Sequence, residues 1–515
     1  MNPIIEIVLT PEEKTDEHNM ERKIGYALGS AYDAKIFYRI LKRSLDARKS
    51  PLYRYRIEVS DKEIPLQPSL KSTYKNVTNC KSIIIVGAGP AGYFAALECL
   101  ALGLKPIIIE RGKNVRDRRR DLKGIQQDHI VNPDSNYCFG EGGAGTYSDG
   151  KLYTRSGKRG DINKVNTIFV EHGASAEILF DAHPHIGSNK LPDIIQNMRS
   201  TIEEFGGQIH FDQKVIDFSI QDGVINGVTT NSNEYHGEAV ILATGHSARD
   251  IFELMHHKNL LIESKSFALG VRIEHPQSLI DSIQYHQKNR HDQLPAAAYS
   301  LACTINDRGV FSFCMCPGGL MVPAATSPGE IVINGMSLSR RDSKFANSGI
   351  VVGVHPLDFQ NSEFDPFCGL NFQKRVEQHV FQAGDGSQKA PAQRLTDFMK
   401  SRISASLPDS SYIPGLWSAP IDEILPSMIV SPLKEGIKLF TSKMKGFYTE
   451  EAVVVATESR TSSPIRIPRN SLSMHPQCAG LIPCGEGAGY AGGIMSAAMD
   501  GQHCARAAYH YVLAN

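Results

Sequence analysis

The sequence predicts an α/β protein: a Rossmann-like three-layer nucleotide-binding domain with an inserted α+β domain, preceded by a small N-terminal α+β domain. Three patterns predict this. A βαβ pattern of about 30 residues begins at Ser82, a β-meander pattern covers 215–236, and a glycine-rich segment near the end of the chain opens a last helix. Because the chain has 515 residues, we expect several folding units of roughly 150 residues each.

The composition excludes several classes of protein. Hydrophobic residues make up 41% and charged residues 21%, so the chain can bury a sizeable core and is not disordered as a whole. The 55 basic side chains balance 55 acidic ones, which argues against binding a polyanion through bulk charge, although not against a local basic patch. The 10 cysteines are irregularly spaced and no signal peptide is recognised, so we expect a cytoplasmic protein.

One stretch has the composition of a membrane span. Residues 82–104 carry a single charged side chain, Glu98. They also contain Gly87, Gly89, Pro90 and Gly92, which suit a buried strand, a tight turn and a packed helix better than a bilayer helix. We therefore expect no contact with a membrane.

Residues 1–78 are expected to form the N-terminal α+β domain, with a helix and three strands before a proline-containing linker. The predicted elements are Ile4–Leu9, Glu17–Leu28, 36–45 and 53–59. Between Lys35 and Arg56 lie eight Lys and Arg residues and one acid, Asp46. This 35–56 segment could bind nucleic acid. We favour a solvated face balanced by the acidic residues of 12–21, because no aromatic stacking platform accompanies it.

Residues 79–250 are expected to form the first part of the nucleotide-binding domain. Ser82–Val86 is a continuous apolar strand, Pro90–Leu102 a buried helix, and 106–109 a second strand that ends at Glu110. A helix at 194–205, a strand at 208–212 and a buried strand at 239–243 are also predicted.

The string G-x-G-x-x-G occurs three times, at 87–92, 140–145 and 487–492. Only the first lies between a predicted strand and a predicted helix and is followed by a second strand with an acid at its end. There, Gly87 permits a tight turn, Gly89 lets the backbone approach a pyrophosphate, and Gly92 lets helix and strand pack closely. The helix start adds N–H groups and a positive dipole end. The predicted phosphate site is Gly87, Ala88, Gly89, Pro90, Ala91 and Gly92.

The acid that follows the second strand predicts a ribose site. Glu110 comes 18 residues after Gly92, where a carboxylate accepts hydrogen bonds from ribose hydroxyls. The neighbouring Arg111 is included in the predicted cofactor site.

The motif alone does not distinguish FAD from NAD, but the end of the chain does. FAD domains of the glutathione-reductase type are completed late in the chain by a strand ending in Gly-Asp or Gly-Glu, and then by a helix whose N-terminus points at the flavin. Here 480–484 leads to Gly485 and Glu486, and the last helix opens after a glycine pair. The strand at 239–243 ends in Thr244-Gly245, like a signature of these flavoproteins. The predicted flavin-side residues are Thr244, Gly245, Gly485, Glu486, Gly492, Gly493 and Ile494.

Five strings extend this interpretation to nearly the whole chain: YCFGEGGAGTYSDGKLYT (137–154), HPHIG (183–187), FCMCPGG (313–319), ESRTSSPIRI (458–467) and CGEGAGYAGGIMSAAMDG (484–501). Together they resemble a bacterial family of uncharacterised FAD-dependent dehydrogenases. The resemblance implies bound FAD and an oxidoreductase, and it brings no known substrate.

A loop of unusual flexibility precedes the first candidate catalytic residue. Residues 140–150 hold five glycines in eleven positions, which is costly in a helix or strand. With the family resemblance, this predicts a loop over FAD that lines the substrate cavity, with Gly142 and Gly143 at the cofactor and Lys151 near the chemistry. An ordinary surface loop is the alternative.

The remaining catalytic candidates are His183, His185, His246 and Arg460. Structural histidines are the simpler interpretation of the first two, and no third ligand is spaced for a metal, so we predict none. An arginine at 460, 466 or 469 could hold an anionic substrate or a nicotinamide phosphate; surface charge is the alternative. Cys314 and Cys316 form C-x-C rather than C-x-x-C, so we expect packed thiols, with a redox relay to the flavin as the alternative.

These patterns predict an FAD-dependent oxidoreductase, a dehydrogenase or reductase, of an unknown small-molecule substrate. We place the substrate domain at 251–450 and the closing part of the FAD-binding domain at 451–515. NAD(P)H is expected at most as a transient electron donor, because no second G-x-G-x-x-G has the full context. A flavin-dependent tRNA or nucleotide modification enzyme and a non-catalytic redox sensor are the alternatives. Substrate, direction of electron flow and oligomeric state stay open.

Overall fold

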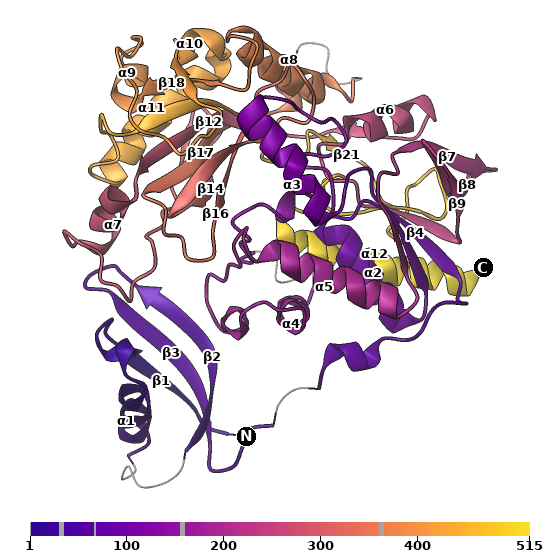
Figure 1. Ribbon diagram of the computed structural model, residues 1–515, viewed down its shortest axis with the longest axis horizontal. Coiled ribbons are helices and arrows are strands. Elements are labelled where there is room, and N and C mark those ends of the chain that lie inside the picture. The colour runs from indigo at the N-terminus through magenta and orange to yellow at the C-terminus, as the bar shows by residue number, and fades with distance from the viewer. Residues whose placement is uncertain (1, 30–35, 66–67, 155–159, 360–364) are drawn as a thin grey trace.

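The computed structural model describes residues 2–29, 36–65, 68–154, 160–359 and 365–515 (Figure 1). The described chain is a mixed α/β protein whose largest sheets have five and seven strands. Among its described helices, none combines the length and the apolar character that crossing a bilayer requires.

The N-terminal strands form a three-stranded antiparallel sheet in the order β1-β3-β2, as the sequence patterns predict. The elements are β1 (Ile4–Leu9), α1 (Glu17–Leu28), β2 (Phe37–Asp46) and β3 (Leu52–Ser60). Buried residues of β1 and β3, among them Ile7 and Ile57, belong to the same hydrophobic cluster as the seven-stranded sheet. This small unit therefore packs on the rest of the molecule.

Four arginines of the basic segment of this sheet form ion pairs, and their partners are not the acids of 12–21 that we expected. Arg39 pairs with Glu58, and Arg48 and Arg54 pair with Asp46. Arg43 reaches across to another part of the chain, where it pairs with two carboxylates, those of Glu177 and Asp181. Glu58 lies on the neighbouring strand, and Glu177 and Asp181 lie far along the chain, so local charge counting finds only the pairing with Asp46.

The five-stranded sheet is parallel and has the order β22-β10-β4-β5-β6. Its strands are β4 (Ser82–Val86), β5 (Lys105–Ile109), β6 (Gln208–His210), β10 (Ala239–Leu242) and β22 (Leu481–Pro483). The last strand comes from the end of the chain and lies beside β10. Two distant segments thus complete one sheet, as the late glycine-rich segment predicts.

Successive side chains of β4 point to opposite faces of this sheet. Ile83 and Ile85 pack in a cluster with the helices α2 (Pro90–Leu102), α5 (Leu191–Glu204) and α12 (Ile494–Ala514). Ile84 and Val86 pack in another cluster, which contains the meander β7 (Val215–Gln221) and β8 (Val224–Thr230). The strand β9 (Glu234–His236) completes the meander. Helices therefore cover one face and the meander covers the other (Figure 1).

The seven-stranded sheet has the order β13-β14-β17-β12-β20-β18-β19 and is antiparallel except for the β18–β19 pair. Its strands are β12 (Phe267–Pro276), β13 (Ala302–Ile305), β14 (Arg308–Cys316), β17 (Phe345–Val354), β18 (Ala390–Arg394), β19 (Leu416–Ser418) and β20 (Val453–Glu458). Because β20 pairs with β12 and β18, the boundary predicted at 450 is wrong, and the chain returns to the parallel sheet only after Glu458.

Shorter elements connect these layers and cover them. The remaining helices are α3 (Val115–Lys123), α4 (Ile162–Glu171), α6 (Arg249–His257), α7 (Gln277–Tyr285), α8 (Cys368–Gln382), α9 (Leu395–Met399), α10 (Ile421–Ile424) and α11 (Ser427–Lys443). The remaining strands are β11 (Glu263–Ser264), β15 (Gly319–Pro323), β16 (Ile333–Ser337) and β21 (Ile465–Arg466). Buried residues of α11 pack in the cluster of the seven-stranded sheet.

Candidate functional site

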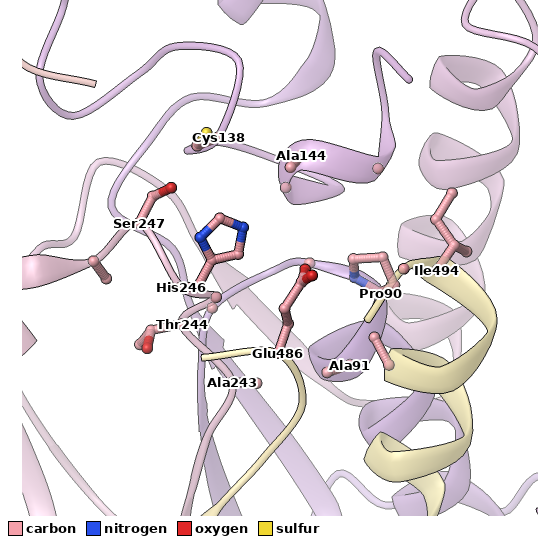
Figure 2. A pocket seen from close by; sticks show the side chains of 18 of the residues that line it. Pro90, Ala91, Cys138, Ala144, Ala243, Thr244, His246, Ser247, Glu486 and Ile494 are labelled. Atoms are coloured by element: carbon pink, nitrogen blue, oxygen red, sulfur yellow. The ribbon is translucent and has the colours of Figure 1, made fainter. Parts of the chain in front are cut away.

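A cavity of about 400 Å³ opens at the carboxyl ends of the parallel strands (Figure 2). Its lining includes Gly87 after β4, Glu110 after β5 and Thr244 after β10. The seven-stranded sheet contributes Phe313 and Cys314 from β14. Carboxyl ends of parallel strands are the usual ligand site of such sheets. Here the cavity also touches the second sheet, so groups from both can meet.

The glycine turn after β4 accepts no side chain at two of its positions. Gly87 has a φ of +108°, and a Cβ there would lie 2.5 Å from the carbonyl oxygen of Ala243. A Cβ on Gly92 would lie 1.9 Å from the carbonyl oxygen of Gly87. Gly89 differs, because the nearest atom to its Cβ position is 4.0 Å away. Side chains are therefore excluded at Gly87 and Gly92, whereas Gly89 faces the open space of the cavity.

Helix α2 begins directly at this opening. Its N-terminal cap is Gly89, no side chain caps its first turn, and Pro90 and Ala91 line the cavity. An uncapped helix N-terminus presents N–H groups and a positive dipole end to an anion. Ala88 and Gly92, by contrast, lie behind the lining and shape the turn.

Glu110 lines the cavity, but backbone groups already bind much of its carboxylate. One oxygen, Oε2, accepts from the N–H of Ala88 at 2.8 Å. The other, Oε1, accepts from the N–H groups of Gly112 and Gly140, each at 2.9 Å. A carboxylate has about four acceptor positions, so roughly one stays available to a ligand hydroxyl. The same contacts fix the glycine turn to the following loop.

Arg111 also lines the cavity and is fixed by acids on two elements. It donates to Asp134 and to Asp250, the latter in α6, and its guanidinium lies 4.3 Å from the centre of the Phe139 ring. These contacts hold its charge at the edge of the cavity rather than free within it.

The glycine-rich loop predicted over the cofactor does lie on the glycine turn. The N–H of Gly142 donates to the carbonyl oxygen of Ala88 at 2.8 Å. Gly143 lines the cavity, whereas Gly142 lies behind it. A fully buried arginine that sequence reasoning missed, Arg118, holds this loop from below and donates to the carbonyl oxygens of Asn136, Glu141 and Gly143. Its position within a run of charged residues at 116–121 carried no signal of burial.

A second helix N-terminus faces the same cavity. Helix α12 begins after Gly493, which has a φ of +90°, and Gly492, Gly493 and Ile494 line the cavity. At Gly492, Gly493 and Gly245, a Cβ would meet no atom within 4 Å. These glycines therefore leave space at the cavity wall. Gly485 instead holds the surrounding backbone together, because its N–H donates to Asp500 and its Cβ position lies 2.9 Å from Ala91 Cβ.

The side chains of Glu486 and His246 point into the cavity (Figure 2). Burial raises the pKa of Glu486 to about 7, although the Gly493 backbone and Lys265 act in the opposite direction. Burial lowers the pKa of His246 to about 3, and the positive charge of Arg460 adds to this. The imidazole is therefore neutral at physiological pH. Its Nδ1 is buried and has no hydrogen-bond partner among the described residues.

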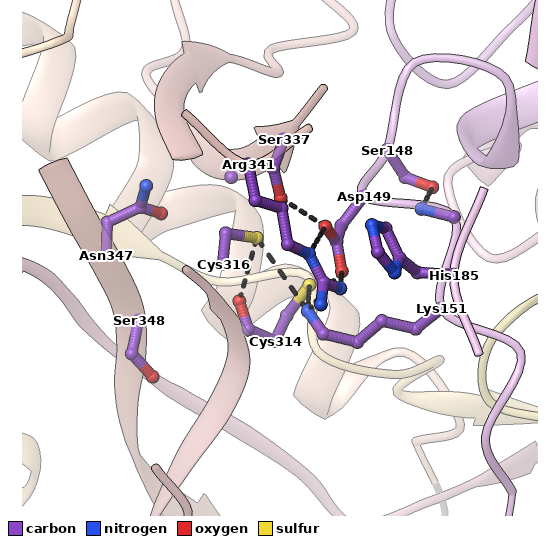
Figure 3. A network of polar contacts seen from close by, with 12 residues as sticks. Ser148, Asp149, Lys151, His185, Cys314, Cys316, Ser337, Arg341, Asn347 and Ser348 are labelled. Carbon is purple, nitrogen blue, oxygen red and sulfur yellow. Dashed lines mark hydrogen bonds and ion pairs between the residues drawn. The ribbon is translucent and has the colours of Figure 1, made fainter. Parts of the chain in front are cut away.

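Lys151 lines the cavity as predicted and belongs to a polar network (Figure 3). Its Nζ lies 3.1 Å from Asp149 Oδ2, and Asp149 also accepts from Arg341 and Ser337. Burial alone would lower the pKa of Lys151, but neighbouring cysteine sulfurs and Asp149 outweigh burial and raise it. The side chain of Lys151 therefore stays protonated and positively charged.

His183 and His185 are not part of this cavity, which contradicts their predicted place. They line a second cavity of about 870 Å³, between the N-terminal sheet, the 173–190 segment and residues near 290. His185 binds the carbonyl oxygen of Ser339 at 3.1 Å, and His183 is exposed against the ring of Tyr153.

Arg460 does not face the cavity either. Its buried guanidinium pairs with Glu330 and Glu377, each at 3.0 Å, and donates to Thr326. Arg249 binds the same two glutamates. The expected substrate contact is therefore replaced by an internal ion-pair network. Of the other candidate arginines, Arg466 is exposed against Tyr490 and Arg469 is paired with Asp500.

Cys484, Asp500 and Cys504 are close enough together to be considered as metal ligands. The two oxygens of Asp500 already accept from Arg469, and one of them also accepts from the Gly485 N–H. Both sulfurs are fully buried. The carboxylate is therefore already neutralised by an arginine, and we assign no metal to this cluster.

Family models, a known protein and solved structures all match this chain. Residues 266–461 match the family described as "FAD-dependent protein, C-terminal domain-like", and residues 1–60 match a domain of unknown function, DUF8436. An uncharacterised protein of Clostridium beijerinckii is 40% identical over 507 residues, which cover 94% of this chain and 95% of the relative.

Solved structures give more distant matches. The flavin-dependent brominase Bmp2 is 10% identical, with a TM-score of 0.38, over 85% of this chain and 80% of that one. CtdE in complex with FAD is 11% identical, with a TM-score of 0.34, over 84% and 88%. A geranylgeranyl bacteriochlorophyll reductase-like protein of Thermoplasma acidophilum is 13% identical, with a TM-score of 0.34, over 85% and 79%.

Proposed function

The chain belongs to a family of uncharacterised FAD-dependent proteins that includes the Clostridium beijerinckii relative, and from this premise we propose that it is an FAD-dependent oxidoreductase of a small molecule. FAD is its cofactor.

The observation that carries the proposal is that two helix N-termini meet in one cavity. Helix α2 opens at Gly89 and helix α12 at Gly493, and both glycines line the same space. FAD carries a pyrophosphate and, when reduced, a negatively charged ring, so it needs two separate sites for negative charge. Helix N-termini suit both.

We assign the pyrophosphate to the α2 end and the flavin ring to the α12 end. At the α2 end, Gly89 leaves open space, and Glu110 retains about one acceptor position for a ribose hydroxyl. At the α12 end, Gly245, Gly492 and Gly493 leave space that a Cβ would enter. His246 lines the same cavity, and its unpartnered Nδ1 fits a polar ligand, because a buried ring nitrogen without a partner is costly.

When bound, FAD supplies two-electron chemistry, and the protein supplies orientation and electrostatics. The α12 N-terminus would stabilise negative charge on the ring. His246 stays neutral and offers one donor and one acceptor without changing charge. Lys151 adds a fixed positive charge on the side of the seven-stranded sheet. The substrate would enter where Tyr153 and Phe313 line the cavity.

The experiment first measures FAD and then its redox activity. Purified protein should release one FAD per chain on denaturation. The bound flavin should be reduced anaerobically by light and a sacrificial donor, and a panel of small-molecule acceptors should reoxidise it. Protein without FAD would reject the proposal. Flavin that cycles with oxygen but turns over no metabolite would favour the redox-sensor alternative.

A further inference from the structure

Two cysteines at the end of β14 share one ammonium group (Figure 3). Lys151 Nζ lies 4.0 Å from Cys314 Sγ and 3.9 Å from Cys316 Sγ. The lysine comes from the glycine-rich loop and the cysteines from the seven-stranded sheet, so this cluster joins the two halves of the molecule beside the cavity. Neither the family matches nor the proposed function assigns a role to the two cysteines.

The backbone at the cysteine pair is irregular. The register of β14 against β17 shifts between Phe313 and Cys316, and Cys314 has a φ of +45°, which side chains other than glycine rarely adopt. In a regular strand, residues two apart are about 6.6 Å apart along the strand, near the upper limit of Cα separations in disulfides. A bulge shortens that separation. Strained conformations of this kind concentrate at functional sites.

The two sulfurs have different environments. Cys314 lines the cavity, whereas Cys316 is fully buried, and its thiol donates to the Cys314 carbonyl oxygen at 3.3 Å. Arg272, which is fully buried and paired with Glu458, approaches the same carbonyl oxygen at 3.4 Å. The neighbouring Cys316 thiol, together with Lys151 and Arg272, lowers the pKa of Cys314, and the neighbouring Cys314 sulfur and burial raise the pKa of Cys316. The pair thus favours one thiolate and one thiol.

We propose that Cys314 and Cys316 are a dithiol–disulfide pair that exchanges two electrons with FAD in the cavity. This rests on the proposed function, because it needs FAD as the oxidant. An S–S bond forms between the two Sγ atoms, and the S–H bond of Cys316 breaks. Two electrons and the Cys316 proton pass to FAD, which gives disulfide and the reduced flavin anion. Atoms and charge balance: thiolate, thiol and FAD become disulfide and FADH⁻.

Lys151 is a positioning residue in this scheme. Its ammonium charge favours the Cys314 thiolate, which is the reactive form of a cysteine. Cys484 and Cys504, which also lie near each other, do not line the cavity and carry no such proposal.

The test counts electrons in the holoprotein. Oxidised protein is titrated with dithionite under anaerobic conditions. Wild type should take up twice as many electrons per FAD as Cys314→Ser or Cys316→Ser, because a disulfide is a further two-electron couple. Cys303→Ser is the matched control, since Cys303 lies in β13 of the same sheet and outside the cavity lining, and it should behave as wild type. Equal electron uptake by wild type and the serine variants would overturn the proposal.

A second measurement needs no variant. Fully oxidised and fully reduced holoprotein are denatured in the presence of iodoacetamide, digested and analysed by mass spectrometry. The peptide that contains Cys314 and Cys316 should be unmodified and disulfide-bonded in the oxidised sample and doubly alkylated in the reduced sample. Double alkylation in both samples would overturn the proposal. A protein without FAD would instead overturn the proposed function, so the two failures are distinguishable.

The role of Lys151 is tested through the pH dependence of alkylation. In Lys151→Met, the pH midpoint of Cys314 alkylation in the reduced holoprotein should rise by about one unit or more, because a neighbouring positive charge is lost. Lys151→Arg should restore much of the wild-type midpoint. An unchanged midpoint in Lys151→Met would remove Lys151 from the proposal.

Discussion

Gly143 packs directly on Gly89: a Cβ on Gly143, which has a φ of +58°, would lie 3.1 Å from Gly89 Cα. Two glycine clusters that are separate in the sequence thus form one wall of the cavity. Gly89 therefore contacts the glycine-rich loop on one side and faces the open space of the cavity on the other. This arrangement makes Gly89 the most direct test of where the pyrophosphate lies.

Replacing Gly89 with Val should reduce FAD binding while the protein stays folded. The side chain would enter the space at the α2 N-terminus and displace at least one hydrogen bond to phosphate. Hydrogen bonds to charged groups contribute about 1.5–3 kcal/mol, so affinity should fall at least roughly tenfold. Flavin content after gel filtration and FAD titration of the stripped protein measure this.

Two variants control this result. Gly89→Ala should give an intermediate affinity, since its Cβ position is 4.0 Å from the nearest protein atom. Gly309→Val, in β14 and outside the cavity lining, should leave FAD content unchanged. Full occupancy by FAD in folded Gly89→Val would count decisively against the placement.

The last helix should set the potential of the flavin. Substitution at Gly492 is the cleaner probe, because its φ is not in the left-handed region, whereas any residue at Gly493, with φ +90°, is strained. Gly492→Leu should hold the ring away from the α12 N-terminus or expel FAD. A helix N-terminus stabilises an anion by about 0.3–1 kcal/mol, and up to about 2 when partly buried.

In a two-electron couple, losing a stabilisation of this size lowers the flavin potential by roughly 6–40 mV. Spectroscopic titration against a reference dye measures the potential. Bulky Gly493 variants should give the same fall or lose FAD. An unchanged potential with full FAD in both variants would place the ring elsewhere.

Much of the fold could be predicted because its signals are local. The apolar runs around Gly87–Gly92, the N-terminal strands and the glycine pair before α12 each describe one turn, strand or helix start. The errors came from partners far apart in sequence. Arg460 binds Glu330 and Glu377, which no local pattern connects to it, and β20 joins the seven-stranded sheet although its apolar run fits either sheet.

Glu486 should make the stability of the FAD-free protein depend on pH. Burial raises its pKa from an ordinary 4.5 to about 7 in the folded chain, so the folded state binds this proton more tightly than the unfolded state. The resulting stabilisation is fully present below about pH 4.5 and is lost as the pH rises through about 7.

Glu486→Gln removes this ionisation. The difference in Tm between the variant and wild type should therefore move in favour of the variant between pH 5 and pH 8. Burial also raises the pKa of Glu458 to about 7, but both proteins retain Glu458, so its contribution cancels in the comparison. A Tm difference that is constant with pH would show that Glu486 is not buried as described.

The last prediction concerns the electron donor. A stable NAD(P)H subdomain needs its own strand–glycine turn–helix–strand unit with parallel strands. Within the described residues, the second sheet is antiparallel apart from the β18–β19 pair, and residues 143–145 form only a short 3₁₀ turn. Arg460, the expected grip for a nicotinamide phosphate, is held by two glutamates. We therefore expect weak or undetectable binding of NADH and NADPH to the FAD-loaded protein in the absence of substrate. Isothermal titration calorimetry measures this, with FAD added to the stripped protein as the positive control. Tight stoichiometric binding of either nucleotide would mean that the cavity or the second sheet holds a nucleotide site that these strands do not reveal.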